Sequence, residues 1–241
     1  MTTQAKTLSN EEQNTMGFRE GLVASVPIAI GFLPIAITFG VIAKAAELTL
    51  TQALAMSLFV FAGASQFVGV NLIVLGVPFA EIVLTTFFLN FRHFLMSSFL
   101  ATKFLPMSKT MLAVVGFGIT DETFSMASIK DGKLSGQFML GLNFLAYSAW
   151  ASGTALGVLL ATGIPASVQA SMGIALYAMF IGLLVPNMKK SFKIAIVAIS
   201  AGIANTVLSQ FLSIGWSIIG ATLIGAIVGT LLSDSGHSSI I

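Results

Sequence analysis

Residues 110–129 read TMLAVVGFGITDETFSMASI, an apolar run of membrane-spanning length that carries Thr-Asp-Glu near its middle. A transmembrane helix needs about 20 mostly apolar residues, but a charge at its centre costs about 2.5–3.5 kcal/mol on insertion scales. Thr120, Asp121 and Glu122 after Gly118 also form a helix start, because Thr caps and the helix dipole favours acids in the first turn. The stretch therefore predicts a broken or re-entrant segment, whose second half-helix runs from about 121 to 129.

The composition of the chain places this stretch in a lipid bilayer. Charged residues are 8% of the 241, hydrophobic residues are 56%, and the mean hydropathy is +0.97, whereas a soluble domain carries roughly 25% charged residues. Eleven basic and nine acidic side chains cannot cover a 25.2 kDa globule with polar surface. This excludes a soluble enzyme, a nucleic-acid-binding domain and a disordered chain. We therefore expect an all-α integral membrane protein.

Motifs of soluble chemistry are missing from the sequence. There is no cysteine for a thiolate metal site, and two histidines do not make a histidine-rich one. No phosphate-binding G-x-x-x-x-G-K-[ST] loop occurs. We therefore expect no metal, no cofactor, no bound nucleic acid and no enzymatic activity.

Eight apolar runs follow one another along the chain. They are too long for strands and lack the alternation of a transmembrane β-barrel, so a polytopic helical bundle is predicted. We expect 1–16 to be a polar N-terminal tail, 17–232 a single transmembrane domain and 233–241 a short C-terminal tail. The runs cover 21–43, 53–76, 80–102, 110–129, 138–161, 168–187, 194–209 and 213–232.

Lysines in the connectors test this count, because cytoplasmic loops carry an excess of Lys and Arg. If all eight runs span, the eight loop lysines divide five against three; if 110–129 enters and leaves on one side, all eight face the cytoplasm. The second arrangement predicts about seven spans (six to eight) plus one re-entrant or broken segment, with the N-terminus outside and the C-terminus inside. Alternatively, Pro27 and Pro34 break the first run into a hairpin, which places the N-terminus inside. The lysines are Lys44, Lys103, Lys109, Lys130, Lys133, Lys189, Lys190 and Lys193, and the Lys-free connectors are 77–79, 162–167 and 210–212.

Pairs of glycines recur at four-residue spacing in the apolar runs. In lipid such pairs let helix backbones approach closely. Packing within the chain is the favoured interpretation, and contact with a partner subunit is the alternative. The pairs are Gly17/Gly21, Gly153/Gly157 and Gly225/Gly229.

The second run contains Phe61-Ala-Gly-Ala-Ser-Gln-Phe67 at its centre. Gly63 and its small neighbours permit close approach or local unwinding, and Gln66 has donors and an acceptor that lipid cannot satisfy. We predict a discontinuous helix near the midplane, with a break at Gly63, whose freed N–H groups, Ser65 and Gln66 bind a polar substrate group. Alternatively, Gln66 makes an interhelical hydrogen bond and the small residues are packing.

The third run places Arg92 and His93 at its centre, where long apolar flanks keep Arg92 from either interface. Such a charge should face the bundle interior and meet a carboxylate or an anionic ligand, and the natural partner is Asp121 or Glu122. His93 can exchange a proton near neutral pH. The alternatives are a structural arginine, a satisfied core histidine, and a solvated 118–124 loop in which both acids are only caps.

These three clusters, Phe61–Phe67, Phe91-Arg92-His93 and Gly118-Ile-Thr-Asp-Glu-Thr-Phe124, resemble in order and spacing the AzlC family. That family comprises the large subunits of bacterial branched-chain amino-acid exporters. The resemblance implies export of hydrophobic amino acids such as leucine, isoleucine and valine. It also implies a location in the bacterial inner membrane and a small AzlD-type membrane subunit as partner. It leaves open whether the chain forms a homo-oligomer.

The leading functional hypothesis is secondary export. The substrate carboxylate would lie near Arg92 or the N–H groups around Ser65, and its ammonium would face Asp121 or Glu122. The aliphatic chain would rest on aromatic rings, and His93 or one of the acids would exchange a proton during the cycle. A passive pore for a small neutral solute and an intramembrane enzyme are the alternatives. The aromatic residues are Phe61, Phe67 and Phe124, and the predicted helix breaks are Pro27, Pro34, Gly63 and Thr120.

Overall fold

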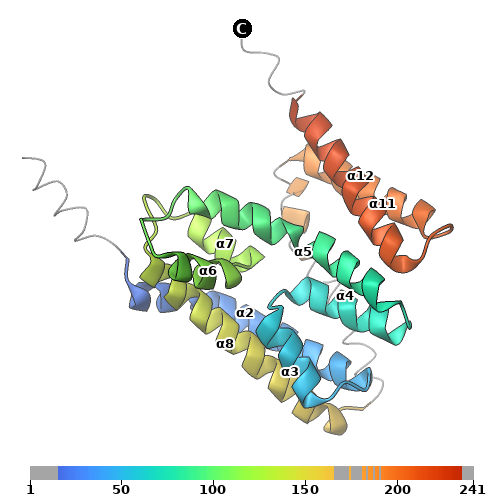
Figure 1. Ribbon diagram of the computed structural model, residues 1–241, viewed down its shortest axis with the longest axis horizontal. Coiled ribbons are helices and arrows are strands. Elements are labelled where there is room, and N and C mark those ends of the chain that lie inside the picture. Colours follow the sequence, from blue (N-terminus) through green and yellow to red (C-terminus); the bar gives the residue numbers. More distant parts are fainter. Residues whose placement is uncertain are drawn as a thin grey trace, which may run out of the picture. The chain divides into compact units, whose positions relative to one another are not determined.

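The computed structural model describes residues 16–165 and 191–234, with separate positions between 174 and 189. The predicted run 168–187 and most of both predicted tails therefore lie outside the described residues. Throughout the described part the chain is helical without a β-strand, which confirms the all-α class (Figure 1). The helices are α2 (Phe18–Ala45), α3 (Leu50–Phe59), α4 (Gly63–Val74), α5 (Phe79–Ala101), α6 (Lys109–Phe117), α7 (Asp121–Ser128), α8 (Gly136–Leu160), η1 (Ala161–Gly163), α11 (Phe192–Leu208) and α12 (Ile214–Asp234).

Four of the described helices are long and apolar enough to cross a membrane: α2, α5, α8 with η1, and α12. Three shorter apolar helices, α3, α4 and α11, accompany them. The predicted run 53–76 is divided into α3 and α4, and 110–129 is divided into α6 and α7. The sequence therefore predicts both discontinuous segments correctly.

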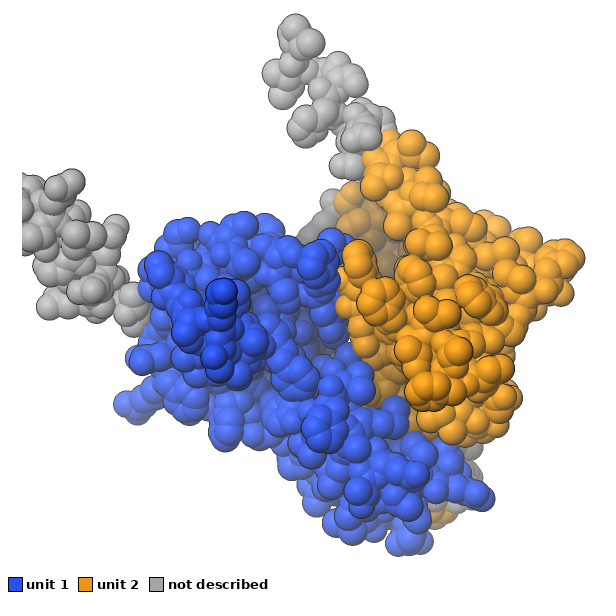
Figure 2. All heavy atoms as spheres, viewed as in Figure 1, with its two compact units in different colours: residues 1–63, 92–163 blue, residues 64–91, 164–241 orange. Residues whose placement is uncertain are grey.

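The chain forms two compact units, coloured blue and orange in Figure 2. Unit 1 comprises residues 1–63 and 92–163, and unit 2 comprises 64–91 and 164–241. The division falls inside α5, between Phe91 and Arg92. A single domain over 17–232 stays a prediction.

Unit 1 is built on the contact of α2 with α8, two helices that run in the same direction. Near their starts, a Cβ added at Gly21 would lie 2.0 Å from the Phe138 carbonyl oxygen. Near their ends, a Cβ at Gly40 would lie 2.3 Å from the Thr154 carbonyl oxygen, and one at Gly157 would lie 2.1 Å from that of Ile37. Only glycine allows backbones to approach this closely, so these glycines pack helices of one chain together.

Pro27 and Pro34 lie inside α2, and the helix is continuous through both. The prediction of helix breaks there, and with it the hairpin alternative, is wrong. A proline removes one N–H from the helix ladder, but neighbouring helices and hydroxyl side chains make such positions tolerable in a membrane. The carbonyls that lose their intrahelical donor are those of Val23 and Ile30, and glycine contacts with α8 on both sides of the prolines accompany the continuous helix.

The pair α6 and α7 leaves one end of unit 1 and returns to the same end. The loops that flank the pair are hydrogen-bonded to each other, from Leu134 N–H to the Lys103 carbonyl at 2.8 Å and from Leu105 N–H to the Leu134 carbonyl at 2.9 Å. The Lys103 ammonium also donates to the carbonyls of Ser128 and Lys130. The segment that contains Asp121 therefore does not cross unit 1, as the lysine distribution predicts.

The start of α2 lies at this same lysine-bearing end, because the Ser135 hydroxyl donates to the Met16 carbonyl. This contact contradicts the predicted combination of an outside N-terminus with cytoplasmic loops, and the side of the membrane on which both lie stays a prediction. Hydropathy counted 53–76 as one crossing, whereas the structure divides it into helices of 10 and 12 residues.

Unit 2 contains the helical hairpin of α11 and α12, closed by the Lys193 ammonium, which donates to the Leu232 carbonyl at 2.6 Å. The Ser213 hydroxyl donates to the Glu81 carboxylate at the other end of the hairpin. This contact brings the Lys-free connectors 77–79 and 210–212 to one end of the unit. It agrees with the prediction that both connectors lie on one side of the membrane.

Replacement of Gly40 by alanine should destabilise the protein, because the new Cβ meets the Thr154 carbonyl and overpacking costs about 1–3 kcal/mol. The matched control is Gly31→Ala on the same helix, where a Cβ meets nothing within 4 Å and alanine gains up to about 1 kcal/mol of helix propensity. Thermal unfolding in detergent should give a lower Tm for Gly40→Ala alone. Equal Tm values for the two variants would contradict the close α2–α8 contact.

Single-cysteine labelling tests the orientation of α2, since the natural chain has no cysteine. Met16→Cys and Asp131→Cys should react with an impermeant maleimide from the same side of the membrane. Lys44→Cys should react from the opposite side, because the 28 residues of α2 span about 42 Å. Labelling of Met16→Cys and Asp131→Cys from opposite sides would contradict the parallel arrangement of α2 and α8.

Candidate functional site

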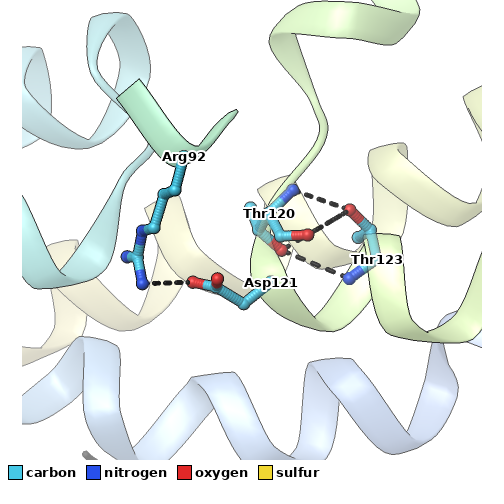
Figure 3. Close-up of polar contacts among 4 residues, drawn as sticks. All are labelled: Arg92, Thr120, Asp121 and Thr123. Atoms are coloured by element: carbon cyan, nitrogen blue, oxygen red, sulfur yellow. Dashed lines mark hydrogen bonds and ion pairs between the residues drawn. The ribbon is translucent and has the colours of Figure 1, made fainter. Parts of the chain in front are cut away.

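Arg92 of α5 and Asp121 of α7 form an ion pair, with Nη1 and Oδ2 3.0 Å apart (Figure 3). Both residues belong to unit 1, and the pairing predicted from sequence is therefore made with Asp121. The side chains are 35% and 30% exposed. A small ligand can therefore reach the pair.

Asp121 is held in place by the capped start of α7. Thr120 is the N-cap: its hydroxyl accepts from Thr123 N–H at 3.3 Å, and its own N–H donates to the Thr123 hydroxyl at 2.8 Å. The Thr123 hydroxyl also donates to the Gly118 carbonyl at 3.2 Å. Figure 3 shows this reciprocal cap directly beside the ion pair. The predicted half-helix start at residue 121 and the predicted break at Thr120 are confirmed.

Asn143 of α8 supports the other side of the break; the sequence makes it a lesser candidate, for a cavity lining or, more readily, a packing hydrogen bond. Its Nδ2 donates to the Val115 carbonyl at 2.9 Å, in the last turn of α6. A Cβ at Gly118 would lie 2.4 Å from the same nitrogen, so the turn that leads to Asp121 rests on the amide. The available signal was a polar amide one turn inside an apolar run.

The break between α3 and α4 is centred on Phe61, whose φ of +43° places it in the left-handed region. A bulky residue there costs of order 1–3 kcal/mol and persists only when its surroundings fix it. The residue is 2% exposed, and its ring packs on Tyr147, Phe32 and Phe117 at centroid distances of 5.0, 6.4 and 6.4 Å. Gly63, the predicted break, is the first residue of α4, and a Cβ there would lie 2.7 Å from the Trp150 ring.

The predicted site residues fall into two groups. Ser65, Gln66 and Phe67 lie in unit 2, where all three are buried in the first turns of α4. The remaining residues belong to unit 1, and there the Phe124 ring packs on Phe99 at 5.7 Å. The joining of both groups around one substrate stays a prediction. The unit 1 group is Phe61, Arg92, His93, Asp121, Glu122 and Phe124.

Unit 1 also retains hydrogen-bonding capacity that the protein itself does not use. Arg92 Nε, Asn143 Oδ1 and Ser25 Oγ are buried atoms without a hydrogen-bond partner. An unmet buried polar atom costs about 1–3 kcal/mol, and such groups are candidates for ligand contacts. Among the residues that the structure describes, no three His, Asp or Glu side chains gather closely enough to hold a metal ion.

Long apolar helices and two interrupted segments define the class, a polytopic helical membrane protein, and the Arg92–Asp121 ion pair is its candidate polar site. The chain belongs to the AzlC family, because the family model described as AzlC protein matches residues 27–164.

Related proteins come from archaea and bacteria. An uncharacterized membrane protein of Archaeoglobus fulgidus is 37% identical over 71% of this chain and 76% of its own length. The inner membrane protein YgaZ of Escherichia coli K12 is 30% identical over 77% and 79%. The branched-chain amino acid transport protein AzlC of Bacillus subtilis is 26% identical over 62% and 60%. No solved structure matches the chain.

A double-mutant cycle tests the ion pair. Arg92→Ala and Asp121→Ala should each lower the free energy of unfolding in detergent, and the double variant should lose less than the sum of the two. We expect a coupling energy of about 0.5–1 kcal/mol, since each side chain is about one-third exposed. The matched cycle of Arg92→Ala with Glu122→Ala should give a smaller coupling. Equal coupling in both cycles would contradict a specific pairing with Asp121.

Proposed function

We propose that this protein is a secondary transporter that exports branched-chain or other hydrophobic amino acids across the cytoplasmic membrane. Family membership and the name of the Bacillus subtilis relative, a branched-chain amino acid transport protein, support a transport role. The observation that carries the proposal is the Arg92–Asp121 ion pair at the start of an interrupted helix. Intramembrane charges and discontinuous helices mark substrate pathways in transporters.

The ion pair suits a zwitterion, because an amino acid carries one charge for each member of the pair. In the proposed cycle the substrate carboxylate replaces Asp121 at Arg92, and the ammonium binds Asp121 or Glu122. Each charge exchanges one opposite partner for another, so neither is left unpaired during the exchange. Phe124 would contact the aliphatic chain in unit 1, and Ser65, Gln66, Phe61 and Phe67 would complete the site during the cycle.

Export against a gradient needs an energy source, and we propose that it is the proton gradient. His93, Asp121 and Glu122 are the ionisable groups at the site that can take up a proton on one side and release it on the other. In this proposal the lysine-bearing loops that flank the α6–α7 pair face the cytoplasm, because cytoplasmic loops carry an excess of Lys and Arg. The small AzlD-type subunit expected from the family resemblance would be the partner in a two-component exporter.

The proposed topology has six crossings and two re-entrant pairs. Met16 and Lys103 both lie at the lysine-bearing end of unit 1, so the chain between them crosses an even number of times. Helices α2 and α5 supply two crossings, which leaves α3 and α4 as a second pair that enters and returns. Helices α8, α11 and α12 supply three more crossings in this proposal, and the C-terminus stays inside. The run 168–187 lies outside the described residues, and its hydropathy alone predicts the sixth crossing.

A passive pore for a small neutral solute is the second candidate, because partly exposed polar groups at the break would suit it too. Counterflow separates the two candidates. A carrier accelerates the efflux of labelled leucine when unlabelled leucine is supplied on the far side, whereas a pore does not. We expect acceleration.

Leucine efflux from cells that express the chain, with and without the small subunit, tests the function. Arg92→Ala and Asp121→Asn should each lower the efflux rate at least about tenfold, which corresponds to a loss of about 1.4 kcal/mol. The matched controls are Lys109→Ala and Asp131→Asn, which remove an exposed charge of the same sign from unit 1. Parental efflux by both site variants, at equal amounts in the membrane, would contradict the proposal.

A further inference from the structure

The start of α2 carries a pocket of about 440 Å³ that the proposed transport site does not use. It belongs to unit 1 and lies at the lysine-bearing end, between the first turns of α2 and the loop that follows α7. Its lining includes the charged side chains of Arg19, Glu20 and Lys130. Val23 and Ala24 line it one turn further along α2. The pocket therefore joins a charged part at the end of the helix to an apolar part deeper in the membrane.

Two cations line this pocket without a partner in the protein. The side chains of Arg19 and Lys130 form no ion pair or hydrogen bond with any residue that the structure describes. Two neighbouring lysines differ: the Lys103 ammonium donates to two loop carbonyls, and the Lys133 ammonium donates to the Thr102 carbonyl at 2.9 Å. Arg19 and Lys130 therefore have donors left for an anionic ligand.

The charge balance of the pocket favours a ligand with one negative charge. Glu20 lines the pocket too, but its carboxylate accepts from the Gly17 N–H at 2.9 Å and is thus bound to the start of its own helix. Two cations and one carboxylate give the lining a formal net charge of +1. One phosphate diester neutralises this charge, and hydrogen bonds from guanidinium and ammonium groups to phosphate are strong because both partners are charged.

The face of α2 that continues from the pocket is apolar and exposed. Val23, Val26 and Ile30 are 65%, 44% and 69% exposed. They follow Arg19 by four, seven and eleven residues, which places all four on one side of an α-helix. At 1.5 Å per residue the stripe from Arg19 to Ile30 is about 16 Å long, roughly half of the 30 Å hydrocarbon core. A charged end and an apolar stripe of this length match a phospholipid in one leaflet.

We propose that the pocket binds the headgroup of a phospholipid with one net negative charge, such as phosphatidylglycerol. Arg19 and Lys130 bind its phosphate, and an acyl chain lies along Val23, Val26 and Ile30. Basic pockets beside membrane helices bind anionic lipid headgroups in this way. Because Arg19 belongs to α2 and Lys130 to the loop after α7, the bound lipid joins these two parts of unit 1. The proposal does not depend on the transport function.

Thermal unfolding of the purified, delipidated full chain in a nonionic detergent is the test. Phosphatidylglycerol should raise the Tm, and phosphatidylcholine, whose choline group cancels the phosphate charge, should raise it less. Arg19→Gln and Lys130→Gln should each increase the phosphatidylglycerol concentration that gives half of the effect about fivefold. Lys109→Gln is the matched control, because Lys109 is an exposed lysine of the same unit that does not line the pocket.

Glycerol phosphate separates a lipid site from a site for free phosphate, because it carries the phosphate without acyl chains. At the concentration where phosphatidylglycerol gives half of its effect, we expect glycerol phosphate to leave the Tm unchanged. An equal rise with both compounds would overturn the assignment to a lipid. Equal effects of phosphatidylglycerol and phosphatidylcholine, or equal shifts of the titration in all three Gln variants, would overturn the site itself. A weaker response in both pocket variants, with the parental response in Lys109→Gln, supports it.

Discussion

The arrangement of this protein depends on one requirement: a helix that stops inside an apolar medium leaves carbonyl groups that lipid cannot satisfy. Helices α3 and α6 both end within apolar runs of the sequence, and α8 supplies a donor to each, from Tyr147 to Leu58 and from Asn143 to Val115. The aromatic rings of Phe61 and Phe117 then meet Tyr147 at 5.0 and 6.1 Å. Helix α8 thus contacts both interruptions and donates one side-chain hydrogen bond to the end of each preceding helix.

The Arg92–Asp121 ion pair also depends on contacts made by α8. Because Asn143 holds the end of α6 and the Gly118 turn, α7 can begin with Asp121 directed at Arg92. The helix dipole favours an acid in this first turn, and the guanidinium supplies the opposite charge. The cap at the start of α7, the contact of the Asn143 amide and the Arg92–Asp121 ion pair are therefore all compatible with the same position of α7. A zwitterionic substrate would exchange partners within this geometry without leaving any charge alone.

Short sequence patterns predicted the helix starts that are determined within one helical turn. Thr-Asp-Glu after glycine gave the start of α7, and Gly-Ala-Ser gave the start of α4, because caps and small residues act within one turn. The prediction of breaks at the prolines of α2 was wrong, because the contacts that keep this helix continuous come from α8, more than a hundred residues away in the sequence. The roles of Asn143 and Tyr147 were hidden for the same reason: each holds a carbonyl 28 or 89 residues distant. The shared end of α2 and the loops around α6 and α7 was not predicted, because hydropathy does not separate one crossing from two short helices.

The parallel contact of α2 with α8 also has a consequence for biogenesis. Helix α2 is synthesised before α8, but the surface that its glycines contact is complete only when residue 160 has been made. Until α8 is inserted, α2 lies in the bilayer without this partner, and Ser25 and Thr38 are on a face of α2 that is buried later. Both helices must also be inserted with the same orientation. The insertion machinery therefore has to return the chain to its starting side before α8 begins, and the lysines at 103–133 lie where they can retain it there.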